Sequence, residues 1–305
     1  MAIPEETLDS WSSYENAAID TAKETHNHIQ ETLNDDNDLS NHDVIALKTL
    51  LQGSYANQTI VRSSGDVDIL AINECRIHSN LDELTENERS DYWDDVRMTT
   101  YSYDDYREDI LEVLKDNYGS VGVTDGSKAI ELDSDYATGI GINADVVPVL
   151  RYKIFETYPG DPTEGIAFKD ENGDWIINFP EQHIQAASNI HGNTNNRYKH
   201  TIRMYKRARN KLADESDFQK STAPSYFIEC LLSNVDHDVI DTHNLQERFL
   251  GVLVDLTDEE KEWESFTAQH GLRELFGEQP EQWNPEDAVE FLTAIIDLWE
   301  NWEDY

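Results

Sequence analysis

A Gly-Ser turn followed by two alternating aspartates is the most constraining feature of this sequence, and it lies in the stretch 51–72. Asp66 and Asp68 alternate with Val67 and Ile69 near the end of that stretch. Because successive side chains of a strand point to opposite faces, both aspartates share one face and both apolar side chains share the other. The pattern predicts a strand that carries two carboxylates on its polar side.

The chemistry of this stretch suits a divalent cation and a phosphate. Two neighbouring carboxylates, here Asp66 and Asp68, raise each other's pKa unless a cation lies between them. Such oxygen ligands suit Mg²⁺, which commonly takes one or two carboxylates together with substrate phosphates. Gly53 lacks a Cβ, so its backbone N–H can approach a phosphate closely, and Ser54 adds a hydroxyl. The stretch therefore predicts a magnesium-phosphate site.

Acidic pairs are common in this chain, and the plain alternative is a solvated strand edge. Asp and Glu make up 63 of the 305 residues, so the Asp-x-Asp pattern also arises by chance. Three other such pairs occur, Asp36/Asp38, Asp133/Asp135 and Asp236/Asp238. Among these pairs, only the one in 51–72 follows a Gly-Ser turn and lies within an apolar alternation.

A third acid, Asp145, lies within an Ile- and Val-rich segment, 139–150, that is predicted to be a strand. Ile142, Ala144 and Val146 fall on one face of that strand, and Asp145 falls on the other. A carboxylate in this position suits a third metal ligand. The alternative is an ordinary outward aspartate on a half-exposed strand.

The rest of the chain predicts an α+β protein with a mixed sheet followed by helices. We expect helices over 5–33, 43–52 and 103–117, and strands over 66–72, 128–132, 139–150 and 175–179. After Pro180 the pattern is helical, over 181–190, 195–212, 224–233, 243–254, 258–270 and 285–301. This layout predicts a sheet lobe over residues 1–180 and a helical lobe over 181–305.

The formal charge of −40 excludes some partners. So acidic a chain repels nucleic acid and anionic membranes, so we expect no strong nucleic-acid binding and no membrane partner. Strong acidity with few lysines is typical of proteins from a salt-loaded cytoplasm, where a Debye length of about 3 Å at 1 M salt screens the repulsion. Two cysteines predict no disulfide framework or zinc cluster, and there is no signal peptide and no run of 18 apolar residues. We therefore expect a soluble, cytoplasmic, halophilic protein.

One segment reverses the acidic trend. No Asp or Glu occurs from 182 to 213, and seven of the 23 Lys and Arg residues lie between 197 and 211. On a helix, Lys199, Arg203 and Lys206 share one face. The neighbouring face is assigned to the core and carries Tyr198, Ile202, Tyr205 and Leu212. The stripe of cations predicts a site for a triphosphate, and the alternative is a helix neutralised by surrounding acids.

The segment that begins at Pro224 predicts a helix start, since Pro is favoured in a first turn. Ser225 supplies a hydroxyl beside free N–H groups, which suits a phosphate. Tyr226 supplies an aromatic ring that can stack on a base. The alternative for Tyr226 is a core aromatic.

The string Gln52–Asn57, followed by Thr59, Arg62 and the segment Asp66–Ile69, resembles the cGAS/DncV-like nucleotidyltransferases, a branch of the polymerase-β-like superfamily. Two positions depart from the pattern of that branch. Gln58 stands where it often has Gly, and Gly65 stands where Ser often precedes the first Asp. Neither departure removes a metal ligand.

The resemblance implies a bilobed α+β fold with a nucleotide-binding cleft between a catalytic sheet lobe and a helical lobe. It assigns the catalytic and metal-binding carboxylates to Asp66, Asp68 and Asp145, which would hold two Mg²⁺ ions, with Mn²⁺ as a substitute. It assigns nucleotide binding to Gln52, Gly53, Ser54, Ser225 and Tyr226. Lys206 matches best the lysine that contacts the phosphates, and Lys199 and Arg203 are the other candidates.

The activity that the resemblance implies is synthesis of a cyclic di- or trinucleotide from ATP and a second NTP in anti-phage (CBASS) signalling, with an effector or regulator encoded in the same operon. One alternative is an enzyme that adds a nucleotide or a tail to RNA, a protein or a small molecule. Another is a catalytically idle nucleotide-binding subunit. Intact carboxylates at all three positions argue against the idle subunit.

Overall fold

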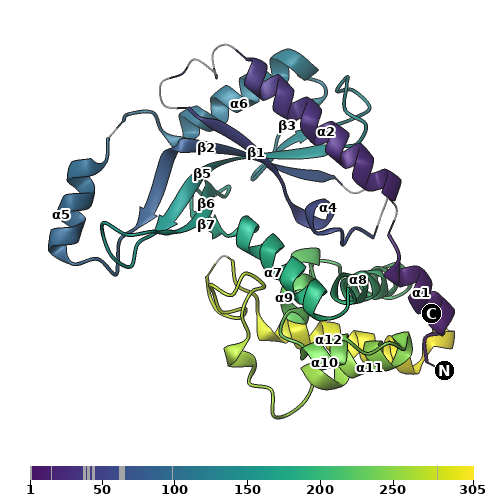
Figure 1. Ribbon diagram of the computed structural model, residues 1–305. Coiled ribbons are helices and arrows are strands. Elements are labelled where there is room, and N and C mark those ends of the chain that lie inside the picture. The colour runs from purple at the N-terminus through teal and green to yellow at the C-terminus, as the bar shows by residue number, and fades with distance from the viewer. Residues whose placement is uncertain are drawn as a thin grey trace. The chain divides into compact units, whose positions relative to one another are not determined.

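A mixed sheet is built around one long parallel pair of strands, β2 (Val67–Asn80) and β5 (Ala144–Ile154) (Figure 1). β1 (Leu47–Leu51) pairs antiparallel with the free edge of β2. On the other edge of β5, its first residues pair with β4 (Ile130–Leu132), which continues to β3 (Val123–Asp125). Its later residues pair with β6 (Thr163–Lys169), which continues to β7 (Trp175–Asn178). Within the described residues, the result is a seven-stranded sheet in which only the central pair is parallel.

The computed structural model describes residues 2–14, 16–36, 39, 42, 45–61, 66–97, 99–279 and 281–305. The chain forms two compact units. The sheet unit comprises Ala17–Tyr55 and Ser64–Pro180. The helical unit comprises Glu181–Tyr305 together with Met1–Asn16 and Ala56–Ser63. The sequence predicted a single division after residue 180, whereas two earlier segments group with the helices.

In the sheet unit, helices α2 (Asn16–Asp35) and α6 (Tyr103–Tyr118) lie beside the sheet (Figure 1). α6 begins with a capping box at Ser102, which satisfies backbone N–H groups that a helix start otherwise leaves free. The buried hydroxyl of Tyr106 donates to the carbonyl of Ala71 in β2 at 3.0 Å. The hydroxyl of Tyr118 lies 2.9 Å from Nδ1 of His28 in α2. Polar contacts thus tie α6 both to the sheet and to α2.

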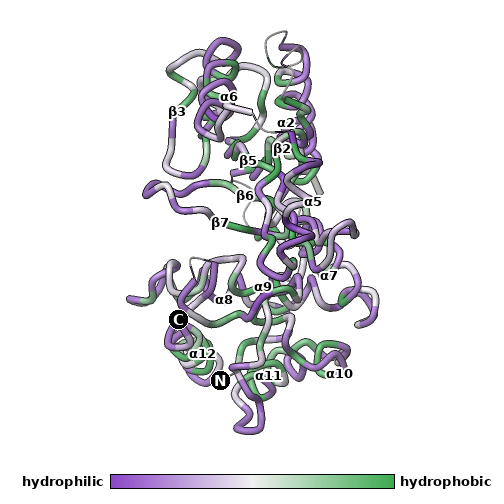
Figure 2. The backbone as a smooth tube through the Cα atoms, turned by 90° about the vertical axis from the view of Figure 1, so that its left-hand side faces the viewer, coloured by the Kyte–Doolittle hydropathy of each residue, from purple (hydrophilic) through white to green (hydrophobic). Residues whose placement is uncertain are grey.

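The helical unit holds the largest apolar core. It contains α1 (Glu5–Ser12), α7 (Pro180–Asn193), α8 (Tyr198–Glu215), α9 (Ser225–Leu232), α10 (His237–Ile240), α11 (Leu245–Leu256) and α12 (Pro285–Glu300), with the short 3-10 helices η1 (Trp263–Ser265) and η2 (Trp302–Asp304). Hydrophobic stretches are visible along α9 and α12 in Figure 2. Their buried side chains pack with those of α8 and α11, which is how an amphipathic helix buries its apolar stripe.

The α+β class is confirmed, but three expected elements are wrong. The segment expected as a helix over 43–52 is strand β1 in its described part, because Leu47–Leu51 finds a pairing partner in β2; Asp43 and Val44 lie outside the described residues. A short apolar run fits either element, and tertiary pairing decides between them. The single helix expected over 5–33 is divided into α1 and α2. The helix expected over 258–270 is replaced by η1 and irregular chain.

Several short helices were missed, and one of them has a start that is encoded locally. α5 (Glu86–Asp95) begins with a capping box, in which Thr85 accepts from the N–H of Glu88 and the Glu88 carboxylate accepts from the N–H of Thr85. The Thr-x-x-Glu signal was readable in the sequence. Among the described residues, no helix combines the length and apolar character that a membrane span requires.

We predict that Tyr106→Phe lowers the free energy of unfolding by about 1 kcal/mol, because it removes the hydroxyl that donates to Ala71 and leaves that buried carbonyl one donor short. Urea unfolding followed by tryptophan fluorescence measures the change. Tyr136→Phe is the matched control, since Tyr136 is largely exposed. Equal effects of both substitutions would contradict the assigned role of the hydroxyl.

Candidate active site

The Gly-Ser turn lies directly against Asp68. Gly53 begins the short helix α4 (Gly53–Asn57) with a φ of 69°, in the left-handed region that favours glycine. A Cβ on Gly53 would lie 2.1 Å from Oδ2 of Asp68. The backbone N–H of Gln52 donates to the carbonyl oxygen of Asp68 at 2.8 Å. The predicted turn is therefore present, and only glycine fits its first position.

The sheet brings the predicted carboxylates together. Asp68 in β2 and Asp145 in β5 are direct partners in the parallel ladder, so their backbones are about 4.8 Å apart and their side chains lie on the same face. Asp66 immediately precedes β2 and is exposed, and its carboxylate contributes to the raised pKa of Asp145 after burial and Asp68. Glu131 in β4 is the direct partner of Asp145 on the other side. Sequence reasoning missed Glu131, because register across strands is not a local property.

This crowding of like charges changes the proton affinity of the central carboxyl. Burial, together with the neighbouring carboxylates of Asp68, Asp66 and Glu131, raises the pKa of Asp145 to about 6. Burial, together with the carboxylates of Asp66 and Asp68, raises the pKa of Tyr55 to about 12. Negative potential is thus concentrated where the central strands β2 and β5 begin.

The donor set fits a hard divalent cation in its chemistry. Carboxylate oxygens are the ligands that Mg²⁺ and Mn²⁺ prefer, and a cation would relieve the repulsion that raises the pKa of Asp145. As the side chains stand, however, no three His, Cys, Asp or Glu residues in the described part of the chain converge closely enough to hold a metal ion. Metal binding by Asp66, Asp68 and Asp145 therefore stays a prediction.

The three cations predicted on α8 lie within the helical unit, and each is more than nine-tenths buried. Lys206 forms an ion pair with Glu229, with Nζ 2.5 Å from Oε1. Arg203 donates to the backbone carbonyls of Ser12 and Gln58, both at 2.6 Å. Within the described residues, the ammonium group of Lys199 makes no hydrogen bond or ion pair. In the described part of the chain, Lys206 is thus the one of the three whose charge is paired with a carboxylate.

The other face of α8 is apolar, as predicted. Its four assigned core residues are all buried in the helical unit, namely Tyr198, Ile202, Tyr205 and Leu212. The helical period therefore predicted the orientation of α8 correctly.

Ser225 and Tyr226 begin α9, with Pro224 at the N-cap. The hydroxyl of Ser225 accepts from Nη2 of Arg209 at 3.3 Å. The ring of Tyr226 stacks on that of His183, with centroids 4.6 Å apart and planes 25° apart. Tyr226 is therefore supported by a second ring, which fixes its orientation.

Glu229 was missed in the sequence analysis although a signal was present. It is the only charged residue of α9, whose sequence is SYFIECLL. A single carboxylate in so apolar a helix has to be buried, and buried carboxylates need partners. Its partners, which include Lys206 and His183, are too distant in sequence to be read from any local pattern.

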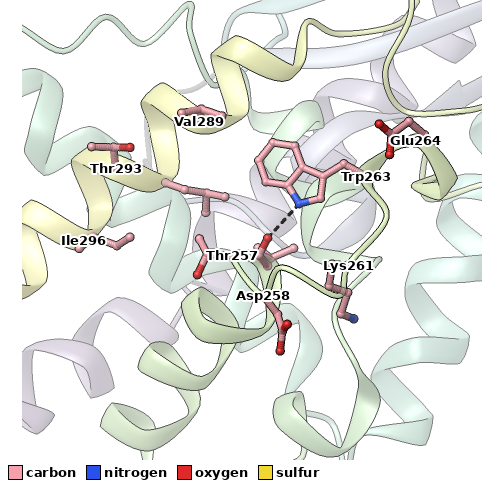
Figure 3. A pocket seen from close by; sticks show the side chains of 10 residues that line it. Thr257, Asp258, Lys261, Trp263, Glu264, Val289, Thr293 and Ile296 are labelled. Carbon is pink, nitrogen blue, oxygen red and sulfur yellow. Dashed lines mark hydrogen bonds between the residues drawn. The ribbon is translucent and has the colours of Figure 1, made fainter.

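The helical unit also contains a cavity of about 440 Å³ beside α12 (Figure 3). Its wall includes Trp263, whose Nε1 donates to the carbonyl of Leu256 at 3.0 Å, and Val289 of α12. Lys261 at its rim pairs with Asp236 and Asp255. No residue predicted for the site lines this cavity.

We expect Gly53→Ala to destabilise the protein by about 1–2 kcal/mol from the left-handed φ alone, with a further cost from contact with Asp68. Chemical denaturation measures the change. Gly192→Ala is the matched control, because Gly192 lies in α7 with nothing near its missing Cβ; it should stabilise by about 0.5–1 kcal/mol. A neutral Gly53→Ala would refute the close approach to Asp68.

The raised pKa of Asp145 predicts that the stability of the folded protein depends on pH. Below pH 3.8 the carboxyl is protonated in both the folded and the unfolded chain and contributes nothing. Between pH 3.8 and about 6 the unfolded chain loses this proton more readily, so stability falls as the pH rises through this window. Without divalent ions, Asp145→Asn should therefore be more stable than wild type by about 1–2 kcal/mol at pH 8, after discounting for solvent screening, and equal to it below pH 4. Thermal melts across this pH range test the prediction, and a variant that is less stable at pH 8 would contradict it.

The comparisons with known proteins agree with this geometry. Residues 186–300 match the family model of the cGAS/DncV-like nucleotidyltransferase C-terminal helical domain. The chain is 33% identical to the cyclic UMP-AMP synthase of Rhodothermus marinus over 99% of both chains. It is 31% identical to the cyclic nucleotide synthase CdnE01 of Staphylococcus haemolyticus over 99% of this chain and 100% of that one.

Solved structures give the same result. The structure of the Rhodothermus marinus CdnE c-UMP-AMP synthase with Apcpp and Upnpp has a TM-score of 0.87 to this chain at 31% identity, covering 98% of this chain and 97% of that one. The CdnE cyclic dinucleotide synthase of Elizabethkingia meningoseptica, solved with GTP and Apcpp, has a TM-score of 0.73 at 25% identity over 96% and 97% of the two chains. Identity of this extent over nearly the whole length shows the family: the chain belongs to the cGAS/DncV-like nucleotidyltransferases.

Proposed function

We propose that this nucleotidyltransferase joins NTPs into a cyclic di- or trinucleotide second messenger. The relatives are named as cyclic nucleotide synthases, which supports a small cyclic product. The observation in this chain that carries the proposal is the paired register of Asp68 and Asp145 beside the turn at Gly53. It combines two carboxylates with a backbone that a phosphate can approach.

The proposed reaction is attack of a ribose hydroxyl on the α-phosphorus of an NTP. A new P–O bond forms to the hydroxyl oxygen, and the bond to pyrophosphate breaks. Two Mg²⁺ ions, or Mn²⁺ in their place, would lower the pKa of the attacking hydroxyl and neutralise charge on the leaving pyrophosphate. Asp66 and Asp68 would hold both ions, and Asp145 would hold one. Asp145 would also accept the proton of the hydroxyl.

We assign the nucleotide contacts to residues of the Gly-Ser turn, α8 and α9. The triphosphate would contact the backbone of Gln52 and Gly53, the hydroxyls of Ser54 and Ser225 and the ammonium of Lys199. Tyr226 would stack on a base. Lys199 is preferred to Lys206 because the ammonium of Lys206 is already paired with Glu229. Arg203 would contribute positive potential, whereas the charge of Lys206 is compensated by Glu229.

The acidic surface shapes the conditions in which the enzyme would act. A net charge of −40 is tolerated best where salt screens it, which supports a halophilic enzyme assayed in molar KCl. The same charge disfavours an RNA acceptor, because a polyanion would be repelled. The product would act in anti-phage signalling on an effector encoded nearby.

We predict that incubation with labelled NTPs and Mg²⁺ or Mn²⁺ in molar KCl yields small labelled species that resist phosphatase. Cyclisation leaves no terminal phosphate for the phosphatase to remove. Label that appears only on added RNA, protein or a small molecule would instead support a transferase. No turnover at any salt concentration would support an idle subunit.

Two double variants test whether activity depends on the carboxylates of the site or on the acidity of the protein in general. Asp66→Asn with Asp68→Asn should reduce product by at least about 1,000-fold while leaving the fold intact, because the ion ligands are lost. Asp236→Asn with Asp238→Asn removes another Asp-x-Asp pair, in the helical unit, and should leave activity within about twofold. Residual activity in the first double variant would overturn the metal assignment.

A further inference from the structure

A buried polar cluster surrounds the carboxylate of Glu229 in the helical unit. Its five members are Asn57, Thr59, His183, Lys206 and Glu229, and none is more than 4% exposed. They come from the end of α4, the chain that follows it, α7, α8 and α9. We call this set the Glu229 cluster.

Glu229 accepts hydrogen bonds from the four other members. Its Oε1 accepts from Nζ of Lys206 and from the hydroxyl of Thr59, both at 2.5 Å. Its Oε2 accepts from Nδ2 of Asn57 at 2.8 Å and lies 2.9 Å from Nε2 of His183. Lys206 also donates to the hydroxyl of Thr59 at 3.1 Å. One carboxylate thus connects four segments of the helical unit.

The cluster holds Glu229 ionised. Burial alone would raise the pKa of Glu229, but the Lys206 ammonium and the bond to His183 outweigh burial and hold that pKa below its usual range. An ionised carboxylate with four donors is a rigid junction, because charge-assisted hydrogen bonds are stronger than neutral ones. The positions of the Glu229 carboxylate and its four donors are therefore well defined relative to one another.

Stability alone does not account for this cluster. Replacing a buried ion pair with well-packed apolar residues is often neutral or stabilising, so such a pair is weak support for a purely structural role. The cluster also leaves two buried atoms without a partner in the described part of the chain, Oδ1 of Asn57 and Nδ1 of His183. Unpaired buried polar atoms are costly. Packing alone would therefore favour apolar side chains at these positions.

The members of the cluster adjoin the residues proposed to bind the nucleotide. Asn57 ends α4, the five-residue helix that begins with Gly53 and Ser54. His183 stacks on Tyr226. Lys206 lies on α8, the helix of Lys199. Displacing any of these contacts would shift a segment that carries a proposed ligand contact.

We propose that Glu229 is a positioning residue of the nucleotide site. It fixes the chain that leaves the Gly-Ser turn, and through His183 it fixes the ring of Tyr226, without itself touching the substrate. This inference rests on the proposed function, since it assigns Glu229 a role in NTP binding.

The test compares three variants of the full-length protein. Glu229→Gln removes the charge at the centre of the cluster, and Thr59→Val removes one donor without leaving a charge unpaired, so it remains informative if Glu229→Gln does not fold. Leu232→Ala is the control, because Leu232 is a fully buried residue of α9 outside the cluster. Two quantities are measured: kcat and KM for each NTP, and amide hydrogen exchange over residues 56–60.

We expect Glu229→Gln and Thr59→Val to raise KM by about tenfold or more and to speed exchange over 56–60, because substrate binding depends on an ordered turn. Leu232→Ala should lower Tm but leave KM within about twofold. Unchanged KM in both cluster variants, or an equal rise in Leu232→Ala, would overturn the inference. If the wild type neither binds nor converts any NTP, the proposed function fails. In that case, faster amide exchange over 56–60 in the cluster variants, but not in Leu232→Ala, would still support positioning of this segment by Glu229. Unchanged exchange would overturn the positioning role.

Discussion

Repulsion between carboxylates that the sheet holds in register is the constraint on which the site depends. Asp68 and Asp145 cannot separate without breaking the parallel pairing of β2 and β5, the central ladder of the sheet unit. Buried neighbours such as Val67 and Val146 lock this register, since a one-residue slip would turn apolar side chains outward. The fold therefore keeps these like charges close together, and burial together with this repulsion raises the pKa of Asp145. A cation bound beside these carboxylates would relieve this repulsion.

The sequence predicted those features of the site that follow from local periodicity. Alternation along a strand places Asp66 and Asp68 on one face, and the helical period separates the apolar face of α8 from its cations, so both predictions needed only neighbouring residues. Glu229 and Glu131 were missed because their roles depend on partners that are distant in sequence. The strand at 47–51 was mistaken for a helix because short apolar runs are ambiguous until a partner strand is known.

The cations of α8 explain why acids are absent from that segment. Arg203 donates to the carbonyls of Ser12 and Gln58, and Arg209 donates to the carbonyl of Ala223. These charges are buried against backbone oxygens, so acids within the same helix would compete for their donors. Such bonds hold other segments of the helical unit to α8. The cations of this stretch thus hold segments of the helical unit together in addition to supplying positive charge. The helical period of the sequence does not reveal this second role.

The surface charge gives the buried ion pair between Lys206 and Glu229 particular value. In molar salt the Debye length falls to about 3 Å, so exposed ion pairs contribute little order to a chain with a net charge of −40. A pair with both side chains almost fully buried is screened far less. At high salt, one buried carboxylate with four donors would therefore order the chain more than many surface pairs would. Such a gain would explain a charge at the centre of α9, where an apolar side chain would satisfy packing alone.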